Sequence, residues 1–180
     1  MSNINHKVFI SYHHADQEEV NEFIKKYDDE EKIFITRALG VDMENNIVDS
    51  ENTDYVMSRI RELYLKDSTV TIIMIGKCTW SRRYVDWEIQ ASLRQDEGTI
   101  PNGLLGIKLP SYNGNGYPDR LNKNLKQTCD QNECYARVIC YPSTKDTIRN
   151  AIEDAFDARK SRNSFIVNPR ERFKYNRTCE

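Results

Sequence analysis

The sequence has no apolar stretch approaching the ~20 residues that a membrane-spanning helix requires. Residues 1–6 show neither the apolar core nor the small-residue cleavage site of a secretory signal peptide. The charges nearly balance, with 26 basic and 28 acidic residues, which argues against a general affinity for nucleic acid or anionic lipid. We therefore expect a cytoplasmic protein with neither a nucleic-acid nor a membrane partner.

Cysteine and glycine patterns exclude further classes. The five cysteines are odd in number and lack C-x-x-C spacing, which argues against a disulfide framework and a structural zinc site and favours a reducing environment. The seven glycines form neither G-x-G-x-x-G nor a P-loop, so a Rossmann or NTPase phosphate cradle is absent. His6, His13 and His14 have no cysteine or carboxylate at ligand spacing, so we predict no metal site.

Segments typical of strands alternate with segments typical of helices. The expected strands are residues 7–12, 32–36, 69–75, 103–109 and 136–141. The third of these is nearly continuous and β-branched, as expected for a strand that is covered on both faces. Residues 112–118 have the composition of a loop.

Four helices are expected between and after these strands. Asp16 and Glu19 form a capping-box pattern before the first apolar stripe. The second helix begins after an N-cap at Asn52, Thr53 or Asp54, the third spans 83–95, and the last begins at Ser143 or Thr144. The apolar positions of the first, second and last helices are Val20, Phe23, Ile24 and Tyr27; Val56, Ile60, Leu63 and Tyr64; and Ile148, Ile152, Ala155 and Phe156.

This alternation predicts an α/β protein with a central five-stranded parallel sheet and helices on both faces. Such sheets bind ligands beyond the carboxyl ends of their strands, where the strand order switches. We therefore expect a site formed by residues 11–14, 40–52 and 77–88.

Two motifs lie in those segments. Ser11, Tyr12 and His13 lie at the end of the first strand and could line a cleft, although composition alone favours a strand end followed by an ordinary N-cap. Glu88 falls at the edge of the apolar face of the third helix, one turn after Tyr84, where partial desolvation would perturb its pKa. The alternative for Glu88 is a solvated helix residue with an ion-pair partner.

Together the two motifs resemble the TIR domain family. Val8-Phe9-Ile10-Ser11-Tyr12 resembles the first box of that family, and Ser81-Arg82-Arg83-Tyr84 with Glu88 resembles its third-helix motif. The stretch 40–52 falls where the family has its BB loop. The resemblance implies a flavodoxin-like three-layer fold, with a TIR-like domain at residues 1–158 and a polar, basic tail at 159–180. The short bacterial TIR-like proteins of Thoeris antiphage defence (ThsB-like) are the most similar in kind.

In catalytic TIR proteins the helix glutamate is essential for cleaving NAD, and the resemblance carries this role to Glu88. The implied reaction breaks the nicotinamide–ribose bond and yields a cyclic ADP-ribose-type signal that activates a separate effector protein. NAD is the substrate, and no cofactor is implied; a phage trigger and a homo-oligomer are left open. The implied substrate-binding residues are Phe9, Ser11, Tyr12, His13, Asp49, Trp80, Arg83 and Tyr84.

Two other functions remain as alternatives. The first is a non-catalytic TIR module for protein–protein interaction, in which Glu88 is structural. The second is an enzyme resembling nucleoside deoxyribosyltransferases, which also act on an N-glycosidic bond with a carboxylate.

Overall fold

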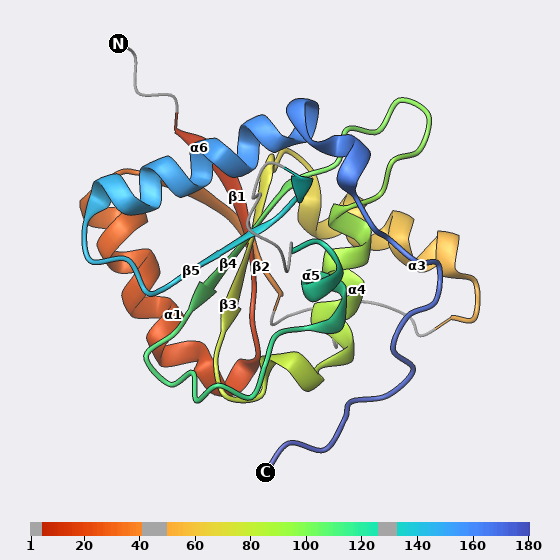
Figure 1. The fold of residues 1–180 in the computed structure, drawn as a ribbon, viewed down its shortest axis with the longest axis horizontal. Helices are drawn as coiled ribbons and strands as arrows, with labels where there is room; N and C mark the ends of the chain where they lie inside the picture. Colours follow the sequence, from red (N-terminus) through yellow and green to blue (C-terminus); the bar gives the residue numbers. More distant parts are fainter. Residues whose placement is uncertain (1–4, 41–49, 126–132) are drawn as a thin grey trace.

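A computed structural model describes residues 5–40, 50–125 and 133–180 of the chain. The described residues form one parallel sheet of five strands in the order β2-β1-β3-β4-β5 (Figure 1). The strands are β1 (His6–Ser11), β2 (Phe34–Leu39), β3 (Val70–Ile75), β4 (Gly103–Lys108) and β5 (Arg137–Ile139). This strand order is that of flavodoxin-like proteins, with a switch point between β1 and β3. The predicted fold class is confirmed.

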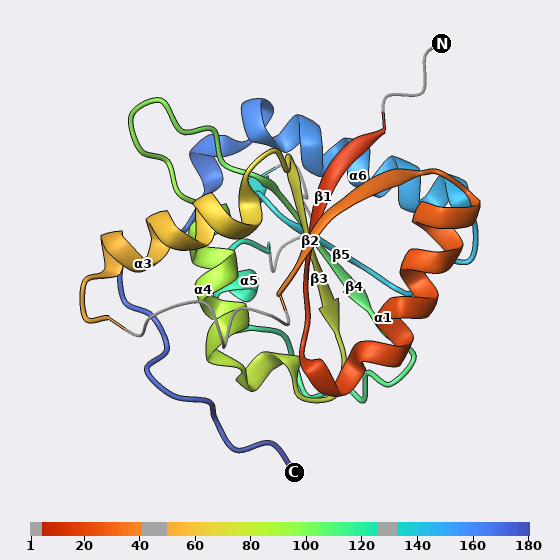
Figure 2. The same cartoon turned by 180° about the vertical axis from the view of Figure 1, so that it is seen from behind.

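Helices cover both faces of the sheet. They are α1 (Gln17–Ile24), α3 (Thr53–Ile60), α4 (Arg83–Ser92), α5 (Asp119–Lys123) and α6 (Lys145–Ser161). Figures 1 and 2 show α1 and α6 on one face and α3, α4 and α5 on the other. Every residue of β3 is buried, as its nearly continuous apolar and β-branched sequence predicts for a central parallel strand.

Local signals set several helix ends as expected. The Asn52 side chain accepts a hydrogen bond from the backbone N–H of Tyr55 and begins α3. Thr144 accepts from the N–H of Thr147 in the same way and begins α6. Both α1 and α3 continue into a π-helical turn, which carries the buried Tyr27 and Tyr64.

Some local predictions are wrong. The capping box at the start of α1 does not form, because the Asp16 carboxylate accepts a hydrogen bond from the Thr79 hydroxyl instead. Leu63 is 43% exposed, since the π-helical turn after α3 shifts its position away from the sheet. Helix α4 ends at Ser92 rather than at residue 95. The short helix α5 was not predicted, since five residues carry too little periodicity to be recognised.

The tail after α6 lies along α4 (Figure 1). The indole N–H of Trp87 donates to the Phe173 carbonyl at 2.7 Å, and Gln90 donates to the Pro169 and Arg170 carbonyls. On the other side of the tail, Arg120 donates to the Pro169 and Glu171 carbonyls at 2.7 and 2.6 Å. These contacts pin residues 169–173 between α4 and α5.

Near its end, the tail is joined to the loop after β3 by a disulfide. Cys78 and Cys179 are bonded, with 5.7 Å between their Cα atoms and a sequence separation of 101. The expectation that the cysteines form no disulfide is therefore wrong for this pair. Sequence spacing did not reveal it, because the two cysteines meet only through the packing of the tail. In the described part of the chain, no helix is long and apolar enough to cross a membrane.

Candidate active site

The carboxyl ends of β1 and β2 meet the first half of α4. Because Ile10 pairs with Leu39 in the parallel register, the next residues along these strands, Ser11 and Gly40, lie side by side. The Ser11 hydroxyl donates a hydrogen bond to Oε2 of Glu88, across 77 residues of sequence. The predicted first box and the predicted helix glutamate are thus in direct contact.

Glu88 is a buried carboxyl group. Only 1% of the residue is exposed, and burial raises its pKa to about 8, while the hydrogen bond from Ser11 lowers it. Among the described residues, Glu88 forms no ion pair. The structure therefore excludes the alternative of a solvated helix glutamate with a surface partner.

The carboxyl group of Glu88 packs against the backbone of Gly40. A Cβ atom at residue 40 would lie within 2.8 Å of the carboxyl carbon of Glu88, closer than packed atoms can approach. A glycine at this strand end therefore makes room for the buried carboxyl group.

The carboxyl group faces a pocket of about 300 Å³, at the lower end of the range for ligand sites. The described residues that line it come from the ends of β1 and β2, from the start of α4 and from the tail: Tyr12, His13, His14, Gly40, Arg82, Tyr84, Val85, Glu88 and Asn176. The site lies beyond the carboxyl ends of the strands, where parallel sheets bind ligands.

The pocket has a cationic side. Arg82 lines it next to His13, whose pKa burial lowers to about 4, with further electrostatic contributions from Arg82 and His14. His13 is therefore a neutral imidazole at pH 7, and Arg82 provides the positive charge on this wall.

The tail contributes to the site through Asn176. Its side-chain Oδ1 accepts a hydrogen bond of 2.9 Å from the backbone N–H of Arg83, the first residue of α4. Arg82, at the N-cap position, makes no side-chain cap. Asn176 therefore satisfies a helix-terminal N–H that would otherwise need water.

The structure brings five of the predicted site residues together. Tyr12, His13, Tyr84 and Glu88 line the pocket, and Ser11 bonds to Glu88.

Four predicted residues lie elsewhere or are not described. Phe9 is fully buried in the core between β1 and α3, where it faces Tyr64. Trp80 is half-buried and is not among the described residues that line the pocket. Arg83 points away along the tail: it donates to the Lys174 carbonyl and lies 4.7 Å from the Tyr84 ring centroid. Asp49 lies outside the described residues.

Sequence reasoning missed five of the described residues that line the pocket: His14, Gly40, Arg82, Val85 and Asn176. Gly40 follows the second strand, and its position at a strand end was the available signal. Arg82 was adjacent to a chosen residue, but the direction of its side chain could not be read from the motif. Nothing near Asn176 indicated a site, because the tail has no apolar periodicity.

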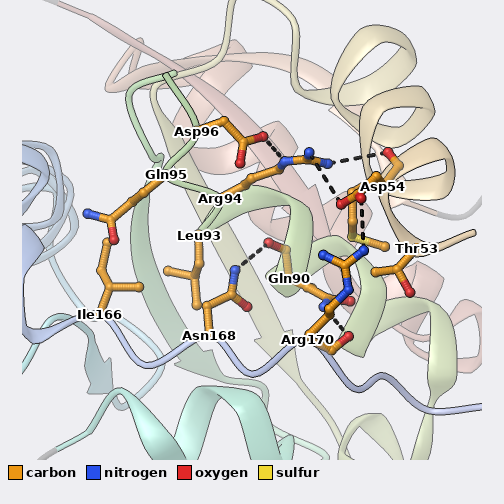
Figure 3. Close-up of a pocket in the computed structure, with 11 residues that line it drawn as sticks. Thr53, Asp54, Gln90, Leu93, Arg94, Gln95, Asp96, Ile166, Asn168 and Arg170 are labelled. Atoms are coloured by element: carbon orange, nitrogen blue, oxygen red, sulfur yellow. Dashed lines mark hydrogen bonds and ion pairs between the residues drawn. The ribbon is translucent and has the colours of Figure 1, made fainter. Parts of the chain in front are cut away.

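A second pocket lies on the other side of α4 (Figure 3). Its charged side chains are already paired with one another: Arg94 bonds to Asp96 and Asp54, and Arg170 bonds to Asp54 at 2.8 Å. Figure 3 also shows Asn168 of the tail reaching the backbone of Gln90. These pairs join the tail to helices α3 and α4 and leave the charged groups of this pocket engaged with one another. We therefore assign the candidate site to the pocket of Glu88.

Within the described residues there is no group of three histidine, cysteine or acidic side chains that could hold a metal ion. The chemistry that the described lining residues offer is therefore that of a buried carboxyl group, a hydroxyl, the neutral imidazole of His13, aromatic rings and one guanidinium.

Comparison with known families gives one match. Residues 9–113, more than half of the chain, match the family described as Thoeris protein ThsB, TIR-like domain. The match includes Ser11, Gly40, Arg82, Tyr84 and Glu88, whereas Asn176 lies beyond it. A comparison with curated proteins found no match. With the flavodoxin-like sheet and the contact between the two boxes in place, the chain belongs to the Thoeris ThsB family of TIR-like proteins, which act in antiphage defence.

Proposed function

We propose that this protein cleaves the nicotinamide–ribose bond of NAD and that Glu88 is its catalytic carboxylate. The observation that carries the proposal is the environment of Glu88, which is buried at the pocket, bonded to Ser11 and without an ion-pair partner among the described residues. A carboxylate held this way is poorly stabilised by the protein alone, so a cationic ligand would be attracted to it.

The reaction suits a site with one carboxylate. The nicotinamide of NAD is a cationic leaving group, and it departs with the electron pair of the C1′–N bond as neutral nicotinamide. No general acid is needed for this departure. The ribose acquires positive charge in the transition state, and an ionised Glu88 beside it would stabilise that charge.

The remaining side chains provide the matching contacts. Tyr84, one turn before Glu88, presents an aromatic face on which the nicotinamide ring could stack. Arg82, on the cationic wall, could pair with the diphosphate. Its neighbour Arg83 is not among the described lining residues and donates to the Lys174 carbonyl of the tail.

The ionisation of Glu88 makes binding and catalysis interdependent. With a pKa of about 8, the empty site holds a protonated carboxyl group at neutral pH. Because an adjacent positive charge favours the ionised form, the cationic nicotinamide ribose would lower this pKa when NAD binds. Binding would thus release a proton and generate the reactive carboxylate.

We further propose that the product is a cyclic ADP-ribose-type signal that acts on a separate effector protein. After nicotinamide leaves, a nucleophile within the same ligand attacks C1′ and loses a proton, which closes the ring. Water attack would give linear ADP-ribose instead. A small soluble product can diffuse from this site to a separate effector protein.

The test is mass spectrometry of NAD incubated with concentrated protein, with Glu88→Gln and with Glu97→Gln as an exposed control on the loop after α4. Lysates of phage-infected cells expressing each form are analysed in parallel, to supply a trigger. Nicotinamide together with a cyclic product, from wild type and Glu97→Gln alone, supports the proposal. Linear ADP-ribose as the sole ADP-ribose product would support the proposed cleavage and contradict the proposed cyclisation.

The same incubations separate the other functions. Exchange of free bases with deoxynucleosides that requires Glu88 would identify a deoxyribosyltransferase-like enzyme. Absence of NAD cleavage in every condition, with the fold intact, would leave a non-catalytic interaction module.

A further inference from the structure

The end of the tail reaches the pocket from a distant part of the sequence. Asn176 lines the pocket and accepts the Arg83 N–H at the start of α4. Next to it, the backbone N–H of Arg177 donates to the Ser81 carbonyl at 2.8 Å, and its guanidinium pairs with Asp119 at 2.8 Å. Two residues later, Cys179 is bonded to Cys78.

These contacts cap the helix that carries the site. Helix α4 holds both Tyr84 and Glu88, and no side chain from the preceding loop caps its first turn. Because Asn176 provides that cap, the position of the first turn depends on where the tail lies. Glu88, one turn further on, is fixed separately by Ser11 and by burial.

The outer contacts of the tail end are weak on their own. Asn176, Arg177 and Tyr175 are exposed, and the Arg177–Asp119 pair is on the surface, where such pairs contribute little. The disulfide is the covalent link that keeps residues 174–179 in place. Both of its cysteines are half-buried, so a small thiol can reach them.

We propose that Asn176 is a positioning residue for the substrate pocket and that the Cys78–Cys179 bond makes its contribution dependent on the redox state. A dithiol reductant passes two electrons to this bond, which opens to two thiols with uptake of two protons, while the reductant becomes a cyclic disulfide. The tail end then leaves α4, the Arg83 N–H loses its acceptor, and the pocket loses one wall. The expected effect of reduction on NAD cleavage rests on the proposed function, whereas its expected effect on α4 does not.

The structural half is tested by hydrogen exchange measured by mass spectrometry on the full chain, with and without a dithiol reductant. We expect reduction to increase exchange in the peptide that contains Arg83 by roughly five-fold at that amide, the factor for one lost hydrogen bond. Asn176→Ala should show the same increase without reductant. Asn176→Asp keeps an acceptor at the helix N-terminus and should restore protection.

The controls isolate the bond. A Cys78→Ser/Cys179→Ser variant should show the fast exchange at all times and ignore the reductant. Cys140→Ser, which removes an exposed free cysteine, should respond like wild type. Alkylation before and after reduction, followed by mass spectrometry, reports whether the bond is closed.

The effect on function is tested by measuring KM and kcat for NAD cleavage separately. Reduction or Asn176→Ala should raise the KM for NAD roughly five-fold with little change in kcat, because Glu88 stays in place. Two results would overturn the proposal: both cysteines alkylated in protein purified without reductant, or a fully opened bond with unchanged exchange at Arg83 and unchanged KM. Increased exchange without NAD cleavage in any form would support the tethered cap and refute the proposed activity instead.

Discussion

Replacing Glu88 by glutamine should stabilise the protein while it abolishes NAD cleavage. The cause is the pKa of Glu88, which burial raises from an ordinary 4.5 to about 8. A pKa difference of one corresponds to about 1.4 kcal/mol, so this rise corresponds to a free energy on the order of 5 kcal/mol. Because single domains unfold with about 5–15 kcal/mol, this effect is a large share of the total.

The sign and the pH window follow from the two states. Below pH 4.5 the carboxyl group is protonated in both the folded and the unfolded chain, and it imposes no charge penalty. Between pH 4.5 and about 8 only the unfolded chain ionises, so the stability that the protonated form provides is progressively lost. Above about pH 8 both states are ionised and the loss stops. Glutamine stays neutral at every pH.

The assay is urea denaturation of wild type and Glu88→Gln at pH 5, 6, 7 and 8, followed by tryptophan fluorescence and without reductant. The difference in the free energy of unfolding should grow with pH by about 1.4 kcal/mol per pH unit, to about 5 kcal/mol at pH 8. The exposed Glu97→Gln should give a constant difference near zero. Equal differences for Glu88→Gln at all four pH values would refute the assignment of Glu88 as a buried, uncompensated carboxyl group.

Three further changes test the site and the tail. Because the cationic substrate requires an ionised Glu88, kcat/KM for NAD should rise with pH toward about 8. Ser11→Ala should move the midpoint of this rise to higher pH, because it removes the hydrogen bond that lowers the pKa of Glu88. An unchanged midpoint in a pH–rate series would contradict the contact between Ser11 and Glu88. Gly40→Ala should reduce cleavage roughly five-fold or more, because the added Cβ displaces the Glu88 carboxyl group and removes at least one hydrogen bond. Full activity in the same NAD assay would show instead that the backbone at residue 40 moves to accommodate the methyl group. Asp86→Ala leaves the buried Arg120 without its ion-pair partner, so the free energy of unfolding measured in urea should fall by about 3–5 kcal/mol. Hydrogen exchange across residues 169–173 should increase, because the Phe173 N–H loses its acceptor. A fall of less than about 1 kcal/mol would show that water compensates the charge of Arg120.

Much of the fold was predictable because its signals are local. The strand β3 is apolar except for Thr71, and the caps Asn52 and Thr144 are side chains that bond within three residues of themselves. The capping box at Asp16 failed for the opposite reason: its partner Thr79 is 63 residues away and competes for the same carboxylate.

In the candidate site, too, the residues marked by local signals were predicted and those placed by long-range packing were not. Ser11 and Glu88 could be chosen because Ser11 ends a recognisable strand and Glu88 lies on a recognisable helix, and the parallel topology brings such positions together. Phe9 was included with its box, but alternation along β1 turns its side chain to the opposite face from Val8 and into the core. Asn176 and the pairing of Cys78 with Cys179 depend on the path of the tail, which no periodic pattern encodes.

The buried pair of Asp86 and Arg120 determines how far the tail can move. Asp86 accepts the backbone N–H of Phe173 at 2.9 Å, while Arg120 holds the carbonyls on either side of Arg170. If the disulfide opens, Cys179 therefore remains tethered to a fixed point only six residues away. A tether this short keeps the effective concentration of the Cys179 thiol near Cys78 on the order of millimolar or higher. Re-formation of the bond requires an oxidant such as a small disulfide, which accepts the two electrons by forming a mixed disulfide with one cysteine. The other cysteine then attacks this mixed disulfide and releases the small thiol, in an intramolecular step whose rate is independent of protein concentration.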